Sequence, residues 1–381
     1  MKTEQIQAFL EEIDDKRQLP GSICLVYHNR KEVLSYSSGY ANPEHRIPYS
    51  KDTILHMFSM TKPITCVAAL QLYEHGAFLM TDPLSDYLPE FQESKVVEKQ
   101  ENGNEIIRPA SAPIRIRDLF TMTSGYCYPQ DENATGRALR SRFGNGAGLS
   151  KVPLRVFARE LAKIPLLFDP GTHWHYGYSH DLLAALVEVI SGQAFSAYVA
   201  ENIFRPLGMN NAWFHLPESE KNRLATLYTF EEKTGELVPA FHETDPVFES
   251  GGAGLFCTAA DYMKFAEMLC KLGTSSDGVR ILGSKTVKMM TTNALTPTQQ
   301  QDFDWIHMRG YGYGYGVRTM TNPSFGGSNS NIGEFGWAGL AGTDLIIDPT
   351  EQLTVVYGHQ RIPNDEPYIH PRLRNVIYAS L

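Results

Sequence analysis

The sequence predicts a mixed α/β (α+β) protein in which one antiparallel sheet, flanked by helices, is built from both ends of the chain. Strand-like segments lie near both ends of the 381 residues, and helical patterns with long Gly/Pro loops fill the middle. We therefore predict a discontinuous α/β sandwich domain, residues 1–80 and 305–381, and an inserted, mainly helical domain, residues 81–304. With 42% hydrophobic and 20% charged residues, the chain can bury one large core or two smaller ones.

The two ends of the chain carry the clearest local signals. The first residues alternate charged and apolar side chains at helical spacing. The segments ICLVYHNR and EVLSYSSGYA are predicted strands joined by a turn at Asn29 to Lys31, which makes an antiparallel hairpin. Near the other end, YGYGVRT, DLIIDPT and LTVVYGHQ are predicted strands, and a last helix is predicted from about Glu366.

Charge and composition exclude several classes of protein. The formal net charge is −9, so no basic field would attract nucleic acid or anionic lipid. The chain shows neither the apolar run of a signal peptide nor about 18 consecutive apolar residues, and we expect a cytoplasmic location without membrane contact. Five scattered cysteines without a C-x-x-C predict reduced thiols, and neither a disulfide framework nor a zinc site: Cys24, Cys66, Cys127, Cys257 and Cys270.

The stretch LHMFSMTKPIT places Ser59 and Lys62 three residues apart at the start of a nearly all-apolar helix. This spacing puts both side chains on one face of a helical turn, where they can share a proton. A serine hydroxyl becomes a nucleophile when a base takes its proton, and burial or a helix N-terminus lowers the pKa of a lysine enough for that task. The alternative is structural, with Ser59 as an N-cap and Lys62 reaching to solvent.

A second stretch, DPGTHWHYGYSHDLLAALVEVISG, places Tyr176 just before another predicted helix. Asp181 is the expected N-cap of this helix and Gly192 its C-terminal stop. With Ser59 and Lys62, this stretch resembles the serine β-lactamase and penicillin-binding protein superfamily, nearest to the branch of class C β-lactamases, family VIII carboxylesterases and transesterases. The resemblance implies a β-lactamase/transpeptidase-like fold and makes Tyr176 the third catalytic residue.

Further ordered segments carry the same resemblance over most of the chain. They are PGSICLVYHNRKEVLSYSSGYA, IRIRDLFTMTSG, with Met122 where the family usually has histidine, and GAGLFCTAADYMKFAEML. In FGWAGLAGTDLIIDP, the residues Trp337, Ala338 and Gly339 replace the family's Lys-Thr-Gly, much as Trp-Gly-Gly does in the esterase branch. This match implies that the triplet lines the substrate site and that the backbone N–H groups of Ser59 and Leu340 bind the oxyanion. The alternative makes Trp337 a core aromatic residue.

One position departs from the family pattern. Tyr178 stands at the third position of Tyr-x-Asn, where the family has an amide that helps to hold the substrate and the lysine. We expect Tyr178 to line the acyl pocket or to pack in the core. The histidines beside Tyr176, at positions 173, 175 and 180, show no metal-ligand spacing.

The resulting prediction is a serine hydrolase that cleaves carboxylic esters through an acyl-enzyme on Ser59, in a cleft between the domains and without a cofactor or metal. Lys62 and Tyr176 act as general base and acid. The chain has no G-x-S-x-G, H-E-x-x-H or P-loop motif that would support another chemistry. The alternatives are acyl transfer to an alcohol, β-lactamase, D-amino-acid peptidase or penicillin-binding activity, and a catalytically silent binding protein.

Overall fold

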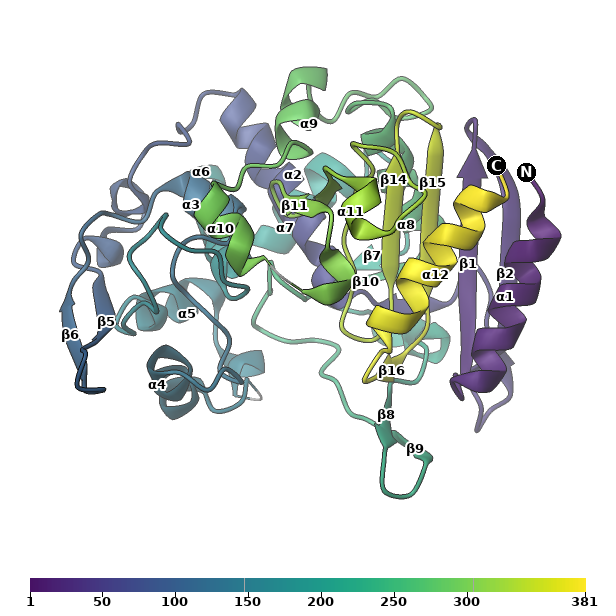
Figure 1. Ribbon diagram of the computed structural model, residues 1–381, viewed down its shortest axis with the longest axis horizontal. Coiled ribbons are helices and arrows are strands. Elements are labelled where there is room, and N and C mark those ends of the chain that lie inside the picture. Colours follow the sequence, from purple (N-terminus) through teal and green to yellow (C-terminus); the bar gives the residue numbers. More distant parts are fainter. Residues whose placement is uncertain (147, 304) are drawn as a thin grey trace.

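An eight-stranded antiparallel sheet forms the right-hand part of the molecule in Figure 1. The computed structural model describes residues 1–146, 148–303 and 305–381. The strand order is β11-β12-β13-β14-β15-β1-β2-β3, so strands from both ends of the chain share one sheet, as predicted. The strands are β1 (Gly21–His28), β2 (Lys31–Asn42), β3 (Ile47–Pro48), β11 (Tyr311–Tyr313), β12 (Arg318–Met320), β13 (Phe335–Gly336), β14 (Asp344–Asp348) and β15 (Leu353–Gly358).

Helices cover both faces of this sheet. Helices α1 (Thr3–Lys16) and α12 (Glu366–Ala379) lie side by side in front of it in Figure 1, and α8 (Ala259–Cys270) packs against β1, β14 and β15. In β1, Val26 belongs to the core under α1 and α12, whereas Leu25 belongs to the core shared with α8. Successive side chains of a strand point to opposite faces, so a strand buried on both sides is apolar throughout.

The helical part lies at the left of Figure 1 and centres on α2 (Thr61–Glu74), which packs against α6 (Ser179–Ser191). Every residue of α2 from Thr61 to Leu70 is buried, which explains the apolar run in its sequence. The other helices are α3 (Ile116–Phe120), α4 (Ala134–Phe143), α5 (Leu154–Leu161), α7 (Phe195–Val199), α9 (Ser284–Met290), α10 (Pro297–Asp302) and α11 (Pro323–Gly326).

Three small sheets complete the described part of the chain. They order as β4-β10-β7, β16-β8-β9 and β5-β6, and the β8–β9 hairpin projects at the bottom of Figure 1. Their strands are β4 (Ile54–His56), β5 (Lys95–Lys99), β6 (Glu105–Pro109), β7 (Ala212–Trp213), β8 (Tyr228–Glu231), β9 (Glu236–Pro239), β10 (Phe256–Thr258) and β16 (Arg361–Ile362).

The structure differs from the sequence-based prediction in two elements. Helix α8 falls inside the predicted helical region 81–304, yet it packs on β1, β14 and β15 of the sheet. The segment YGYGVRT does not form one continuous strand: it runs from the end of β11 through a turn into β12, where Tyr313 pairs with Arg318. Gly316 has a φ of +74°, and a methyl group there would lie 2.6 Å from Cys66 Sγ in α2, so this glycine permits the turn to approach α2 closely.

Among the helices of the described residues, no single one is both long and apolar enough to cross a membrane. Helix α6 and the helical segment Phe195–Phe204 reach that length only together, as a pair bent by 79°.

Charged side chains are buried between the sheet and α12. Glu334 is fully buried, and the guanidinium groups of Arg318 and Arg374 approach its carboxylate at 3.8 Å and 3.6 Å. Tyr311 donates a hydrogen bond to the same carboxylate, and Arg318 also pairs with Asp344 at 3.2 Å. In a buried network of this kind, removing one charge leaves its partners without compensation.

We therefore expect Glu334→Gln to lower the free energy of unfolding by about 3–5 kcal/mol, because Arg318 and Arg374 would lose a buried countercharge. Urea unfolding followed by circular dichroism measures this change. The matched control is Glu12→Gln, which removes the exposed ion pair between Glu12 and Lys16 and should cost about 1 kcal/mol or less. Equal effects of the two substitutions would contradict this assignment.

Candidate active site

Ser59 lies in a 3₁₀ turn, Phe58–Met60, that connects β4 to α2. Phe58, directly before it, has a φ of +44°, a backbone conformation that is costly for a residue with a side chain and that is found often at functional sites. Gln360 fixes the strand that leads into the turn. Its side-chain oxygen accepts a hydrogen bond from His56 N at 3.0 Å, and its amide nitrogen donates to His56 O at 3.3 Å.

Lys62 is completely buried, so it does not reach solvent. Its Nζ donates hydrogen bonds to Ser59 Oγ at 3.0 Å, Tyr128 Oη at 3.3 Å and the carbonyl oxygen of Gly252 at 2.7 Å. These three acceptors match the three donors of an ammonium group. The contact between Lys62 and Ser59 is the one that the Ser-x-x-Lys spacing predicts.

Tyr128 and Gly252 were not assigned to the site from the sequence. Tyr128 follows the IRIRDLFTMTSG segment by three residues, in the loop before α4, and no spacing rule connects it with Lys62. A backbone carbonyl such as that of Gly252 leaves no side-chain signal. Only the position of Gly252 at the start of the GAGLFCTAADYMKFAEML segment could have indicated it.

Tyr176 reaches the same lysine with its ring. Lys62 Nζ lies 4.6 Å from the centroid of this ring, within the range of a cation–π interaction. The hydroxyl oxygen of Tyr176 accepts a hydrogen bond from the indole Nε1 of Trp337 at 3.1 Å. Tyr128 also contacts Tyr176 edge to face, with 5.6 Å between ring centroids. Two tyrosines therefore flank Lys62, one hydrogen-bonded through its hydroxyl and one presenting its ring.

Trp337 and the loop after it lie beside the turn that carries Ser59. Trp337 and Ala338 are nearly buried, whereas Leu340 is 54% exposed. A methyl group at Gly339 would lie 2.4 Å from the carbonyl oxygen of Met57, so the backbone of this loop passes close to the residues before Ser59. Trp337 is thus both a packed aromatic residue and a hydrogen-bond donor to Tyr176.

Tyr178 lies behind Tyr128 and is only 5% exposed. Its ring packs edge to face on Tyr128 and Phe157, with centroid distances of 4.8 Å and 5.0 Å. This position favours the packing role over direct contact with an acyl group, because Tyr178 is buried among these rings and it is Tyr128 that hydrogen-bonds to Lys62.

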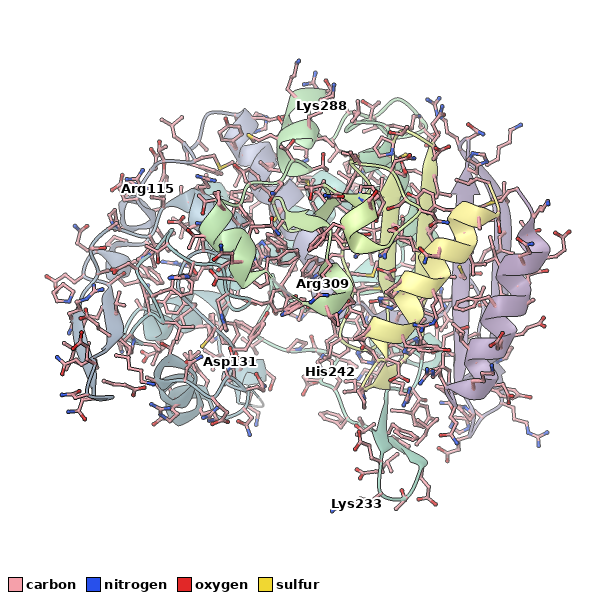
Figure 2. The ribbon with its side chains drawn as sticks, in the orientation of Figure 1. Arg115, Asp131, Lys233, His242, Lys288 and Arg309 are labelled. Atoms are coloured by element: carbon pink, nitrogen blue, oxygen red, sulfur yellow. The ribbon has the colours of Figure 1, made fainter. Side chains whose placement is uncertain are left out.

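The three histidines near Tyr176 have different partners or environments. His173 contacts Asp302, His175 contacts Asp131 at 2.9 Å, and His180 is buried in α6. Asp131, on the helical side in Figure 2, also accepts a hydrogen bond from Tyr128 N at 3.2 Å and so joins the loop of Tyr128 to the residue before Tyr176. In the described part of the chain, no group of three or more His, Cys, Asp or Glu side chains could hold a metal ion.

Two histidine rings pack against Phe58, the residue before Ser59. The ring of His242, labelled below the centre of Figure 2, lies 5.0 Å from the ring of Phe58 and 5.1 Å from that of His56. Burial lowers the pKa of His242 and lowers that of His56 to about 3. Both rings are therefore neutral near pH 7, which keeps positive charge away from this side of Ser59.

The beta-lactamase family model matches residues 6–377. The chain belongs to this family. It is 27% identical to esterase EstB of Burkholderia gladioli over 92% of this chain and 88% of that protein. It is 32% identical to acyltransferase calJ of Penicillium decumbens, over 69% of this chain and 62% of that protein. The structure of EstCE1, described as a hydrolase with promiscuous acyltransferase activity, superimposes with a TM-score of 0.82, 23% identity and coverage of 99% of this chain and 97% of that one.

These comparisons confirm the predicted fold and family. The relatives named esterase and acyltransferase are proteins to which this beta-lactamase-family chain is similar.

The two tyrosines beside Lys62 should differ in their effect on catalysis. Tyr176→Phe should lower kcat by about 100-fold or more, because it removes the hydroxyl expected to carry a proton. Tyr128→Phe removes one hydrogen bond to Lys62 and should lower kcat by about tenfold. Steady-state kinetics with an aryl ester measure both, and the control is Tyr178→Phe, which removes a hydroxyl from a buried ring that packs on Tyr128. Wild-type kcat in Tyr176→Phe would contradict its assignment.

Proposed function

We propose that this beta-lactamase-family chain is a serine hydrolase that cleaves neutral carboxylic esters through an acyl-enzyme on Ser59. The observation that carries the proposal is the 3.0 Å contact between Lys62 Nζ and Ser59 Oγ, made by a fully buried lysine. A lysine without exposure beside a serine at a strained turn has little structural use, whereas it suits the activation of a nucleophile.

The proposed reaction has two stages. Ser59 Oγ attacks the ester carbonyl carbon while its proton passes to the pair of Lys62 and Tyr176. The carbon–oxygen bond of the ester then breaks, and the pair returns the proton to the leaving alkoxide, which departs as an alcohol. Water next attacks the acyl-enzyme, gives a proton to the same pair and releases the acid, and the proton returns to Ser59. The backbone N–H groups of Ser59 and Leu340 stabilise the oxyanion in both stages.

The surroundings of Trp337 favour an uncharged substrate. Trp337 provides an indole where the family's Lys-Thr-Gly provides an ammonium group, and the nearby Arg361 is engaged elsewhere. The Arg361 guanidinium pairs with Asp365 at 2.9 Å and stacks on the ring of Phe230 at 4.4 Å. Trp337 therefore offers no positive charge to a substrate carboxylate, and the guanidinium group of Arg361 is already paired with Asp365.

Acyl transfer to an alcohol is the second candidate, and the similarity to acyltransferase calJ supports it. The two reactions share the acyl-enzyme and differ only in the nucleophile of the second stage. Product analysis with added short-chain alcohols distinguishes them.

Ser59→Ala should abolish turnover of an aryl ester while the fold is retained, because the substitution removes one hydroxyl from a short turn. A fluorophosphonate should add one covalent label to the wild-type protein, located on Ser59 by mass spectrometry, and none to the variant. Labelling at another serine would refute the assignment of the nucleophile, and a wild-type protein that takes no label would favour a binding protein on this fold.

Substrate preference tests the role of Trp337. We expect kcat/KM for a neutral short-chain aryl ester to exceed that for a chromogenic cephalosporin by at least about 10- to 150-fold, the worth of one lost charge-assisted hydrogen bond to the cephalosporin carboxylate. Spectrophotometric assays of both substrates under the same conditions measure the ratio. Efficient cephalosporin hydrolysis without ester turnover would instead assign β-lactamase activity.

A further inference from the structure

A continuous chain of hydrogen bonds joins Lys62 to a buried carboxylate on α6. Lys62 Nζ donates to the carbonyl oxygen of Gly252 at 2.7 Å. The N–H of the same peptide group, on Ala253, donates to Ser250 Oγ at 3.0 Å. The hydroxyl of Ser250 in turn donates to Asp181 Oδ1 at 2.6 Å. One peptide group and one hydroxyl therefore connect the ammonium group of the lysine to the carboxylate.

Helix capping does not explain why the Asp181 carboxylate is buried. The sequence predicted it as the N-cap of its helix, but α6 begins at Ser179 and Asp181 lies within the first turn. Its side chain turns toward the 250–252 segment, where Oδ1 also accepts a hydrogen bond from Gly252 N at 3.2 Å. A methyl group at Gly252 would lie 2.8 Å from Asp181 Oδ2, so a glycine is required for this approach. Asp181 is therefore a carboxylate with 1% exposure whose side chain faces the residues that hold Lys62.

Within the described residues, Lys62 forms no direct ion pair, because its three hydrogen bonds go to two hydroxyls and one carbonyl. The titratable groups that face Lys62 or Asp181 from the elements packed around them are Cys66 of α2, Tyr128 of the loop before α4, Tyr176 and Tyr178 before α6, and His180 of α6.

Four of these neighbours favour their neutral forms because they are buried: Cys66, Tyr128, Tyr178 and His180. Burial and the charge of Lys62 lower the pKa of His180 well below its usual range. Burial raises the pKa of Cys66 and Tyr128 far above theirs, and it raises that of Tyr178 as well. Burial also raises the pKa of Asp181, while the hydrogen bond from Ser250 and the charge of Lys62 oppose this rise. Asp181 is the one carboxyl group among these residues, and the hydrogen bond from Ser250 and the charge of Lys62 favour its ionised form.

We propose that Asp181 is the countercharge of Lys62 and acts through Ser250 and the Gly252–Ala253 peptide group, as a positioning residue that sets the pH range in which Lys62 can accept the proton of Ser59. Hydrogen bonds in such a chain polarise one another, so a carboxylate at one end strengthens the carbonyl acceptor at the other. The carboxylate therefore stabilises the protonated lysine and keeps the ammonium group directed at Ser59.

This inference rests on the proposed serine hydrolase mechanism, and it predicts the direction in which the pH profile of activity moves when the charge of Asp181 is removed. Removing the negative charge disfavours protonated Lys62, so the proton-accepting form exists at lower pH. The acidic limb of the pH profile should then move to lower pH. A purely structural role for Asp181 would lower activity at all pH values without moving this limb.

The test is Asp181→Asn, which keeps an oxygen able to accept from Ser250 and Gly252 but removes the charge. We expect the acidic limb of kcat/KM for an aryl ester, and that of the second-order rate of fluorophosphonate labelling, to move by about one pH unit to lower pH. Ser250→Ala keeps the charge and breaks the chain of hydrogen bonds, and we expect a smaller movement in the same direction. Circular dichroism and thermal melting establish that each variant is folded.

Asp118→Asn is the matched control, because Asp118 is another buried carboxylate in the first turn of a helix, but its partners are Arg115 N and Thr123. This variant should leave the midpoint of the limb unchanged. A folded Asp181→Asn with an unmoved limb overturns the inference. Should that variant fail to fold, an unmoved limb in Ser250→Ala overturns it. Activity retained in Ser59→Ala would instead refute the proposed function, so the two failures are distinguishable.

Discussion

The burial of the Lys62 ammonium group is the constraint on which the rest of the site depends. An ammonium group without solvent must find an acceptor for each of its donors, since an unpaired buried charge is costly. Ser59, Tyr128 and Gly252 supply these acceptors from three separate segments of the chain. The fold must therefore hold the turn before α2, the loop before α4 and the segment before β10 in one arrangement.

Several contacts along α2 provide that arrangement. Thr65 Oγ1 donates to the carbonyl oxygen of Gly251 at 2.7 Å, and the hydroxyl of Tyr262 in α8 donates to Met60 O at 2.7 Å. On the sheet side, the Gln360 side chain holds both polar groups of the His56 backbone. Because the strained Phe58 lies between these anchors, the surrounding structure determines the position of Ser59. A nucleophile fixed in this way needs little reorganisation during the reaction.

The sequence was sufficient for features that local patterns encode. The hairpin of β1 and β2, the buried helix after Lys62, the last helix and the pairing of Ser59 with Lys62 were predicted because alternation, apolar runs and helical spacing act over a few residues. The family resemblance added Tyr176 and Trp337, which the structure brings together at 3.1 Å.

The remaining features depend on contacts between distant segments. Tyr128 is 66 positions from Lys62 and Gly252 is 190 positions away. No local sequence pattern around either residue predicts its contact with the lysine. The turn at Gly316 was mistaken for part of a strand because glycines in an aromatic segment fit both, and only the approach to Cys66 decides between them. Asp181 looked like an N-cap for a similar reason. An acidic residue near a helix start suits capping in general, whereas here its partners are supplied by a segment 69 positions away.

The replacement of a lysine by Trp337 changes the balance of charge in the site as well as its shape. With an indole at this position, Lys62 is the one cation in direct contact with Ser59 among the described residues. The indole N–H is directed at the hydroxyl of Tyr176, so its hydrogen bond orients a proposed proton carrier and does not hold a substrate anion. The carboxylate of Asp181, reached through Ser250, then balances the remaining cation. Such a site favours a neutral ester over an anionic substrate, because among the described residues the cation beside Ser59 is already balanced and the nearby Arg361 is already paired with Asp365.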